Sequence, residues 1–348
     1  MIPIGERLKL ARLKARLSQR ELAERVGVSA MSISKYENNA MVPGAETLIK
    51  LAQALDVRLE FLLRQAPRLH IEPVYRRYKQ MGAKAQEAVK AQIQDWLERY
   101  LLVESLLPEE VHVQMPQGFP RPVRTLDDAE RAAAALREAW QLGSAPIDNL
   151  TELLEGKGVK IGLVEGAEDF DACTFLYDGH FPVIAVNQNR PADRQRFDLA
   201  HELGHLMMRV AGGLDEEKAA HRFAAAFLVP AEVAIMELGH RRSHLDLYEL
   251  LELKGKYGMS VAAWVHRAQD LGILPDHAAR QLWRQLSARG WRKQEPLALP
   301  AETPSRMYRL VRRLVAEGII SEARAAELMG QRIALFPAPP EEARALHH

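Results

Sequence analysis

Residues 193–208 have the sequence Asp-Arg-Gln-Arg-Phe-Asp-Leu-Ala-His-Glu-Leu-Gly-His-Leu-Met-Met, which is typical of an α-helix with one apolar face. His201 and His205 are four residues apart, so both imidazoles would project from the same side of this helix. Together with the adjacent Glu202 they form the pattern of a catalytic zinc site, in which two neutral nitrogens bind the ion and a carboxylate takes a proton from water. The alternative is a chance match on a surface helix, which the apolar face of the segment disfavours.

A metal centre of this kind needs a third protein ligand. We expect Gly212-Gly213 to end the first helix by a chain reversal, and a second helical segment then extends from Asp215 to Pro230. Glu217 and His221 are four residues apart on that second helix, so both could face the histidine pair. From the residues alone, either side chain could complete a site that keeps a fourth position open for water.

The segment before the histidine helix predicts a small β-sheet. Residues 159–164, 173–177 and 181–186 have strand-like patterns, and Asp178-Gly179 between the last two is a hairpin signal. An exposed edge strand beside the metal helix could hold a substrate backbone in extended form. For Cys173, within these strands, we expect a buried structural role rather than redox sensing.

These segments resemble the ImmA/IrrE family of metallopeptidases. The matching stretches are Val183-Ile-Ala-Val-Asn187, Arg194-Gln-Arg-Phe197, the run from His201 to His205, and Phe223-Ala-Ala-Ala-Phe-Leu-Val-Pro230. The resemblance implies a zincin-like fold, a zinc or manganese ion, and cleavage of repressor-type helix-turn-helix proteins.

The family pattern also suggests the third ligand. Its second helix usually contains Glu-x-Glu-Ala-Asn-x-Phe-Ala, and the first glutamate of that motif binds the metal. Aligned on this motif, Glu217 takes the ligand role, so the resemblance favours Glu217 over His221. Ala219 and His221 depart from the motif, and His221 therefore remains the alternative third ligand.

A mechanism follows from these parts. Zinc would polarise the scissile carbonyl and lower the pKa of bound water to about 7. Glu202 would act as general base and then pass the proton to the leaving amine. The sequence does not identify the group that stabilises the oxyanion; the candidates are Tyr177, His180, His240 and His244.

The amino-terminal region predicts a bundle of five short helices. The expected helices cover residues 4–16, 19–25, 30–37, 45–55 and 59–65. Ser18 and Ser29 are expected N-caps, and residues 26–28 form a tight turn. The predicted core consists of Leu8, Leu22, Ala23, Val28, Ile33, Leu48, Leu51 and Leu55.

Residues 4–65 resemble the XRE family of helix-turn-helix domains. The motifs that match are Ser-Gln-x-x-Leu-Ala, Gly-Val-Ser, Ile-Ser-x-Tyr-Glu and Leu-x-x-Leu-Ala-x-Ala-Leu. The resemblance implies that the third helix enters the major groove of a double-stranded DNA operator. It assigns base contacts to Ala30, Met31, Ser32 and Ser34, and backbone or base-edge contacts to Gln19, Lys35 and Asn38.

Local charge supports the same role. Residues 1–36 contain eight Arg or Lys and three Glu, a difference of 8 − 3 = +5, although the whole chain has a net charge of only +1. A basic patch of this kind attracts phosphates irrespective of base sequence. The alternative is a helical docking module without affinity for DNA.

Length and composition limit the remaining choices. A chain of 348 residues predicts two or three domains, and 47% hydrophobic residues is typical of a globular protein. The sequence has no apolar run of membrane-spanning length and no signal-peptide core at its start. Its single cysteine excludes an internal disulfide. We therefore expect a cytoplasmic protein with no membrane partner.

Between Pro73 and Pro108 the apolar positions predict one long helix. The nine steps from one apolar position to the next cover 33 residues, about 3.67 residues per step. This spacing is close to that of an unbent helix, and such a helix would be roughly 50 Å long. This helix either pairs with a second copy in a homodimer that binds two half-sites or lies along its own peptidase domain with a break near Gly82. Residues 108–124 contain four prolines and predict a linker.

The sequence therefore predicts an α+β, mostly helical protein. We expect a five-helix XRE domain in residues 1–66, a long connecting helix and linker in 67–124, a zincin-like peptidase domain with a small sheet in 125–275, and a helical C-terminal region in 276–348. The first function hypothesis is a transcriptional regulator whose metallopeptidase cleaves a partner repressor or its own linker. The alternative is a transcription factor, or antitoxin-type autoregulator, whose peptidase-like domain senses a ligand, metal or partner without proteolysis.

Overall fold

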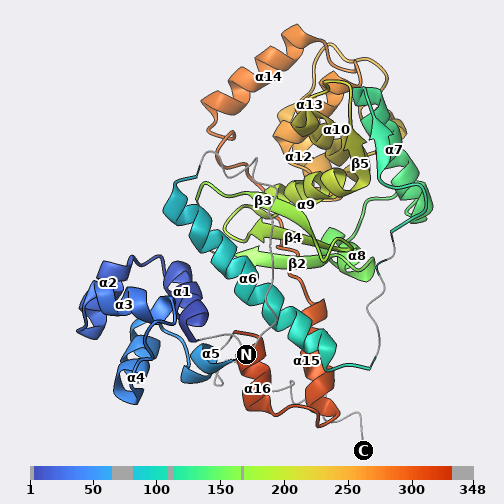
Figure 1. Cartoon of the computed structure of the whole chain (residues 1–348). Helices are drawn as coiled ribbons and strands as arrows, with labels where there is room; N and C mark the ends of the chain where they lie inside the picture. Colours follow the sequence, from blue (N-terminus) through green and yellow to red (C-terminus); the bar gives the residue numbers. More distant parts are fainter. Residues whose placement is uncertain (1–3, 65–80, 109–112, 114, 166–167, 331–348) are drawn as a thin grey trace, which may run out of the picture. The chain divides into compact units, whose positions relative to one another are not determined.

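The computed structural model describes residues 4–64, 81–108, 113, 115–165 and 168–330 (Figure 1). The chain divides into two compact units, the first made of residues 1–111 together with 305–348 and the second of residues 112–304. It therefore passes from one unit to the other twice, once near residue 111 and once near residue 304. This grouping differs from the expected C-terminal region 276–348, because its first helix belongs to the second unit and its later helices belong to the first.

The first unit begins with the five expected helices. They are α1 (Ile4–Lys14), α2 (Gln19–Val26), α3 (Ala30–Glu37), α4 (Ala45–Ala54) and α5 (Leu59–Leu63). The Ser18 hydroxyl accepts a hydrogen bond from the Glu21 backbone N–H in a capping box, and Gly27 ends α2 with a φ of 76°. Ser29 caps α3. The eight residues predicted for the core all belong to one apolar cluster, which confirms the helical bundle.

The connecting helix α6 (Ala83–Ser105) starts later than the expected helix. It begins after Gly82, and the part of the prediction on residues 65–80 lies outside the described residues. It packs on α1 of the helical bundle and on two C-terminal helices, α15 (Arg306–Ala316) and α16 (Glu322–Leu328). Its apolar positions Tyr100 and Val103 are thus covered within its own unit, by residues of α15 and α16.

The second unit contains the predicted small sheet. Its strands are β2 (Lys160–Val164), β3 (Ala172–Tyr177) and β4 (Phe181–Asn187), in the order β2-β4-β3. β2 is parallel to β4, whereas β3 and β4 form the expected antiparallel hairpin. Asp178 and Gly179 have positive φ angles of 51° and 69° in its turn, a conformation that these residue types tolerate well. Cys173 is buried in β3.

Four helices of this unit pack on the sheet or on one another. They are α7 (Leu126–Ala139), α8 (Leu150–Gly156), α9 (Ala192–Met207) and α10 (Glu216–Leu228). α9 packs on β3 and β4, α8 packs on β2, and α10 packs against both α9 and α7. The helix that carries the two histidines is therefore held between the sheet and a second helix.

Two local expectations in this unit were wrong. α9 ends at Met207, five residues before the glycine pair, because Met208–Val210 forms the short strand β5. Its parallel partner is β1 (Arg121–Val123), which lies in the stretch that the sequence assigned to an irregular linker. Neither three-residue strand has a periodic pattern long enough to be recognised.

The unit continues with α11 (Ala231–Leu238), α12 (Leu247–Tyr257), α13 (Val261–Asp270) and α14 (Asp276–Ala288). Ser260 caps α13. Among the described helices, none is by itself both long enough and apolar enough to cross a membrane, although the bent pair α10 and α11 meets the length and composition criteria jointly.

Candidate functional site

The two histidines of α9 lie side by side. Their Nε2 atoms are 3.1 Å apart, and their rings meet at 62° with centroids 4.9 Å apart. His201 is almost completely buried, at 1% exposed, and the His205 side chain is 14% exposed. The one-turn spacing in the sequence therefore produces two convergent nitrogens at the edge of the core.

Glu217 reaches the same point from α10. Its Oε2 lies 3.3 Å from His201 Nε2, and its Oε1 lies 3.5 Å from His205 Nε2. Asp215 fixes the start of this helix by accepting hydrogen bonds from the backbone N–H groups of Glu217 and Lys218. Glu217 therefore sits in the first helical turn, directly across from the histidine pair.

Close packing of α9 and α10 makes this approach possible. A Cβ atom placed on Gly204 would come within 3.0 Å of the Phe223 ring, so the glycine allows the two helices to touch between the histidines. Phe223 is fully buried and stacks on Phe227 along the apolar face of α10. A side chain at position 204 would require Phe223 to shift by a few tenths of an ångström where α10 contacts α9.

The three side chains fit a divalent cation. One ligand atom from each of His201, His205 and Glu217 lies within 4.8 Å of the others, and the closest pairs are 3.1–3.5 Å apart. Tetrahedral coordination with metal–ligand bonds of about 2.0–2.1 Å places ligand atoms about 3.3 Å from one another. Two imidazole nitrogens and one carboxylate oxygen suit zinc and are compatible with manganese. The donor set and its spacing therefore agree with the expected metal centre.

Three further side chains surround this cluster. Glu202, the expected general base, is 2% exposed on α9 beside the two ligand candidates. His221 is not in the three-residue cluster; its ring stands edge-on to His201 with the centroids 4.5 Å apart. Glu216, which the sequence argument did not single out, has Oε1 3.5 Å from Nδ1 of His205. A carboxylate at the second ring nitrogen orients a metal-binding histidine, and adjacency to Glu217 was the available signal.

The candidates for oxyanion stabilisation do not join this cluster. Tyr177 ends β3, and burial together with the nearby Asp178 carboxylate raises the pKa of its phenol. His180 belongs to the β3–β4 turn, where its Nδ1 lies 2.6 Å from the Asp178 carbonyl oxygen. His240 and His244 lie in the loop between α11 and α12. Their proposed role therefore stays a prediction.

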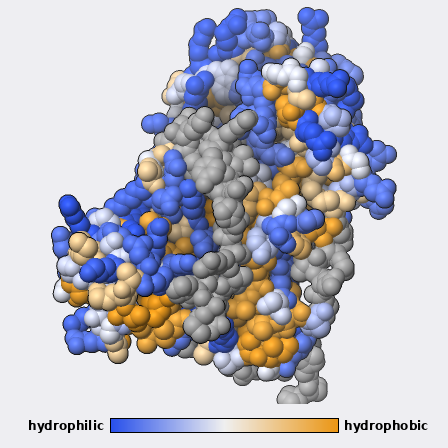
Figure 2. Space-filling view, in the orientation of Figure 1, coloured by the Kyte–Doolittle hydropathy of each residue, from blue (hydrophilic) through white to orange (hydrophobic). Residues whose placement is uncertain are grey.

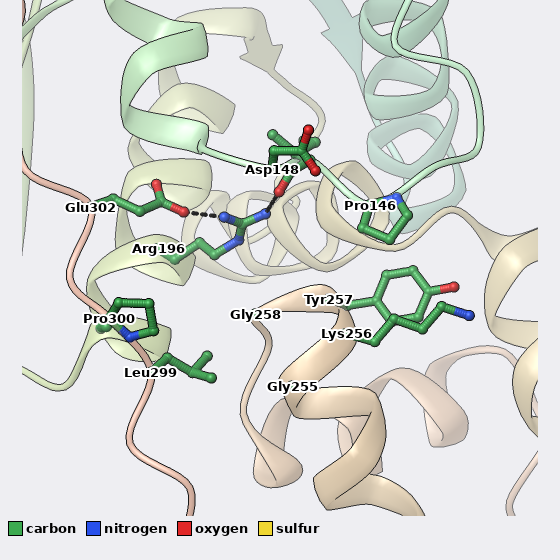
Figure 3. Close-up of a pocket in the computed structure, with 12 residues that line it drawn as sticks. Pro146, Asp148, Arg196, Gly255, Lys256, Tyr257, Gly258, Leu299, Pro300 and Glu302 are labelled. Atoms are coloured by element: carbon green, nitrogen blue, oxygen red, sulfur yellow. Dashed lines mark hydrogen bonds and ion pairs between the residues drawn. The ribbon is translucent and has the colours of Figure 1, made fainter.

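A small cavity of about 210 Å³ lies at the amino end of α9, and its lining includes none of the three cluster residues (Figure 3). Arg196 points at Glu302 and also donates to the Ile147 carbonyl oxygen. Glu302 belongs to residues 295–304, which we call the strap because this segment connects the second unit to α15. The cavity is thus a gap beneath the strap.

The strap is attached by carboxylates at both ends. Glu302 accepts a hydrogen bond of 2.9 Å from the Thr151 backbone N–H in the first turn of α8. Glu295 accepts from the backbone N–H groups of Val261 and Ala262 in the first turn of α13, and it also pairs with the buried Lys254. Both carboxylates therefore satisfy helix N-termini, where negative charge is stabilising.

The expected DNA-contacting residues lie on the outer side of α2 and α3. Met31 is 67% exposed, Lys35 and Asn38 are exposed, and Ala30, Ser32 and Ser34 are partly exposed. Gln19 differs from these because its amide donates a 2.8 Å hydrogen bond to Glu37. Glu37 also binds the Arg12 guanidinium and is buried, which fits a structural role.

The charge on this face is smaller than the local count of +5. Arg7 is buried in an ion pair with Glu98 of α6, and Lys14 lies 2.7 Å from Asp95 of the same helix. Arg64 also contacts Asp95, at 3.0 Å. Burial raises the pKa of Asp95, but the charges of Arg99, Lys14 and Arg64 outweigh burial and hold this pKa well below its usual range. These partners lie more than 80 residues from α1, so a local count could not include them.

Comparison with known families separates the chain into the same two parts. Residues 8–62 match the family model described as helix-turn-helix, and residues 163–269 match the model described as the IrrE N-terminal-like domain. The chain is thus an XRE-type helix-turn-helix domain joined to a domain of the M78 peptidase type. Both resemblances inferred from sequence motifs are confirmed at this level.

Curated relatives match the chain over about sixty residues. It is 38% identical over 60 residues to the HTH-type transcriptional regulator ImmR of Bacillus subtilis, which is 17% of this chain and 47% of that regulator. It is 36% identical over 61 residues to repressor protein C2 of Salmonella phage P22, 18% of this chain and 28% of that repressor. It is 36% identical over 59 residues to the cryptic phage CTXphi transcriptional repressor RstR of Vibrio cholerae, 17% of this chain and 53% of that repressor. The matches span about half or less of each relative.

Proposed function

We propose that this chain is a DNA-binding transcriptional regulator whose second unit is a metal-dependent endopeptidase. The observation that carries the proposal is the convergence of His201, His205 and Glu217, with Glu202 beside them on α9. A structural role for this cluster would not require a buried carboxylate next to three metal-ligand atoms. The chemistry of the site therefore favours hydrolysis of a peptide bond.

The side chains of the site have different roles in the proposed reaction. His201, His205 and Glu217 would hold a zinc or manganese ion, which when bound polarises the peptide carbonyl and lowers the pKa of bound water to about 7. Glu202 removes a proton from the attacking water as its oxygen bonds to the carbonyl carbon. As the carbon–nitrogen bond breaks, Glu202 returns that proton to the leaving amine. Glu216 would orient the His205 ring through Nδ1.

The sheet offers a place for the substrate backbone. In the order β2-β4-β3, the described part of β3 pairs with β4 on one side, and α9 packs on both strands. An extended peptide could pair with the remaining edge of β3 as an added strand. This arrangement would bring a peptide bond of the substrate alongside the helix that carries Glu202.

The chain connects the two units twice, and this favours a separate protein, rather than the chain itself, as the substrate of the peptidase. A cut in residues 108–124 would break the first passage but would leave the second one near residue 304. The helices α15 and α16 would still pack on α6, and α6 would still hold α1 through buried ion pairs. Self-cleavage at that linker would therefore not release the DNA-binding unit, so a separate repressor is the better candidate.

The test compares wild-type protein with Glu202→Gln. Each protein, loaded with zinc or manganese, is incubated with a proteome-derived peptide library, and new amino termini are identified by mass spectrometry. We expect wild type to cut and Glu202→Gln to be slower by about 10²–10⁴-fold, because loss of a general base has effects of this size. Metal analysis serves as the control and should give the same metal content for both. Equal cutting by the two proteins, or no cutting by metal-loaded wild type, would contradict the peptidase proposal.

A second candidate function is a regulator that senses a ligand or metal without proteolysis. The observation that favours it is the strap, because Glu302 contacts Arg196 on the metal helix and α15 begins four residues later in the other unit. A change in α9 could therefore alter the DNA-binding unit through the strap. DNA affinity that changes with metal in Glu202→Gln as much as in wild type, without any proteolysis, would support this function.

A further inference from the structure

The segment formed by most of α14 and the turn after it is strongly basic. Residues 277–294 contain five Arg or Lys and no Asp or Glu. All five cations are exposed, and we call them the α14 basic face: Arg280, Arg284, Arg289, Arg292 and Lys293. In a chain whose net charge is only +1, this is a local concentration of positive charge outside the helix-turn-helix domain.

Acidic residues close to this face are already used by other partners. Glu295 accepts hydrogen bonds from α13 and pairs with Lys254, and Asp276 accepts one from Gln269. On neighbouring helices, Asp270 pairs with Arg222, and Glu249 pairs with Arg242. Besides Glu249, the helix α12 contains one further acidic residue, Glu252, which is exposed. The five cations are thus not matched by an equal number of available carboxylates.

Aromatic rings hold two of the guanidinium groups in place. Arg289 lies over the rings of Tyr248 and Trp291, with its Cζ 5.8 and 5.5 Å from their centroids. Arg292 lies over the Trp283 ring at 5.2 Å. A stacked arginine keeps its full charge and its outward hydrogen-bond donors, since the ring neutralises neither. These contacts therefore orient charge at the surface without cancelling it.

The charged and the buried residues of α14 lie on different sides of the helix. Ala279, Leu282 and Leu286 are buried on one side of α14, whereas Arg280 and Arg284 are exposed on the other, one turn apart. Like charges at this spacing destabilise a helix slightly, by a few tenths of a kcal/mol. The surface over α14, at the top of Figure 2, is hydrophilic. The exposed side of α14 is therefore polar, and the Tyr248 ring, 60% exposed, lies beneath Arg289.

The basic run of α15 provides a useful contrast. The sequence stretch Met307-Tyr-Arg-Leu-Val-Arg-Arg-Leu also suggests a nucleic-acid contact. However, Arg313 pairs with Glu317 at 2.7 Å, and Arg309 donates to Ser305 at 2.8 Å. Arg312 pairs with Glu322 of α16 at 3.6 Å, so these three arginines have partners within their own unit.

We propose that the α14 basic face binds the phosphate backbone of double-stranded DNA, as a second contact beyond the helix-turn-helix domain. Arginine is well suited to phosphate, and five exposed cations without equal acidic partners complement a polyanion. Duplex DNA is the favoured polyanion because the helix-turn-helix domain of the same chain would hold it at high effective concentration. Contacts to phosphate carry no base specificity, so the face would add affinity and not select the operator.

The test measures how strongly salt weakens DNA binding. Full-length wild type and Arg280→Gln/Arg284→Gln are titrated against a fluorescent random-sequence duplex between 50 and 200 mM salt, concentrations chosen to reveal phosphate contacts. Each lost phosphate contact should reduce the slope of log K against log salt by about 0.9, so we expect the slope to fall by about 1 to 2. Because both arginines are exposed, thermal unfolding and metal content should stay unchanged.

The matched control is Arg124→Gln/Arg131→Gln, which removes the same charge from exposed positions of the same unit. We expect its slope to equal that of wild type. The proposal is overturned if both double variants change the slope equally, if neither changes it, or if wild type fails to bind duplex at 50 mM salt. It is also overturned if the α14 variant binds DNA normally but loses an acidic protein partner. None of these outcomes depends on proteolysis, so they are independent of the peptidase test.

Discussion

The cluster of candidate metal ligands and the first unit are assembled over very different distances in the chain. The cluster takes all three candidate ligands from residues 201–217, on two consecutive helices. The first unit combines residues 4–64 with α6 and with helices that begin about 300 residues after α1. This difference determines which features can be inferred from short motifs and which require the folded structure.

The largest expected effect concerns the ligand cluster, whose members lie close together in the sequence. Glu217→Ala should weaken zinc binding by more than about 100-fold, because even changes in the outer shell of a metal site cost about 10–100-fold. His221→Ala should weaken it by about tenfold or less, since its ring contacts His201 and is not in the ligand cluster. Affinities can be measured by competition with a zinc-responsive chelator.

His240→Ala is the matched control, because it removes a histidine from a loop outside the cluster. It should bind zinc as wild type does. If His221→Ala has the larger effect, the third ligand is His221 and the family motif is misleading at the position of Glu217.

The cluster could be predicted because its parts follow helical periodicity. The spacing of His201 and His205 implies one shared face, and the acidic start of the next helix supplies Glu217. The choice between Glu217 and His221 could not be made from the spacing, since both lie on the same face of α10. In the structure Glu217, and not His221, belongs to the three-residue cluster, so Glu217 stays our proposed third ligand.

The architecture of the first unit could be predicted only in part. Caps at Ser18 and Ser29 and an apolar pattern predicted five helices correctly. The position of α6 depends on ion pairs such as Arg7 with Glu98, whose members are 91 residues apart. No periodic pattern links such residues, because each one alone is an ordinary charged residue on an amphipathic helix. The local charge count failed for the same reason.

The second prediction tests the contacts that hold the first unit together between residues far apart in the sequence. Glu98→Gln should destabilise the first unit by about 3–5 kcal/mol, because it leaves the buried Arg7 without its ion-pair partner. Amide hydrogen exchange in α1 and α6 reports this loss of stability within the intact chain. Weaker DNA binding should accompany it, since α1 belongs to the helix-turn-helix core.

Glu87→Gln, on the same helix, is the control for this change. Glu87 is about half exposed and pairs with Lys90 three residues away, so its loss should cost less than about 1 kcal/mol. Equal exchange rates in the two variants would mean that the buried ion pairs of α6 do not hold α1, and that other contacts position the helix-turn-helix domain.

The smallest expected effect comes from cutting the chain between the two units. A specific protease site inserted after Gly118 should be tolerated, because this residue has a φ of 81° and open space around it. After cleavage, we expect both fragments to elute together in gel filtration, since Tyr100 and Val103 of α6 still pack with Val311 and Leu314 of α15. DNA affinity should change by less than about twofold, far below the tenfold that 1.4 kcal/mol would produce.

A second site, inserted after Pro304 at the end of the strap, distinguishes this architecture from two domains on a simple tether. Cleavage at Gly118 and Pro304 together breaks both connections and leaves Glu302 with its partners Arg196 and Thr151, so a piece carrying the ligand cluster should separate from a piece with α1–α6 and α15–α16. Separation after the single cut at Gly118 would show that α15 and α16 do not hold α6 in solution. Release of the DNA-binding unit by one self-inflicted cut would then become possible again, and the argument for a separate repressor as substrate would lose its main support.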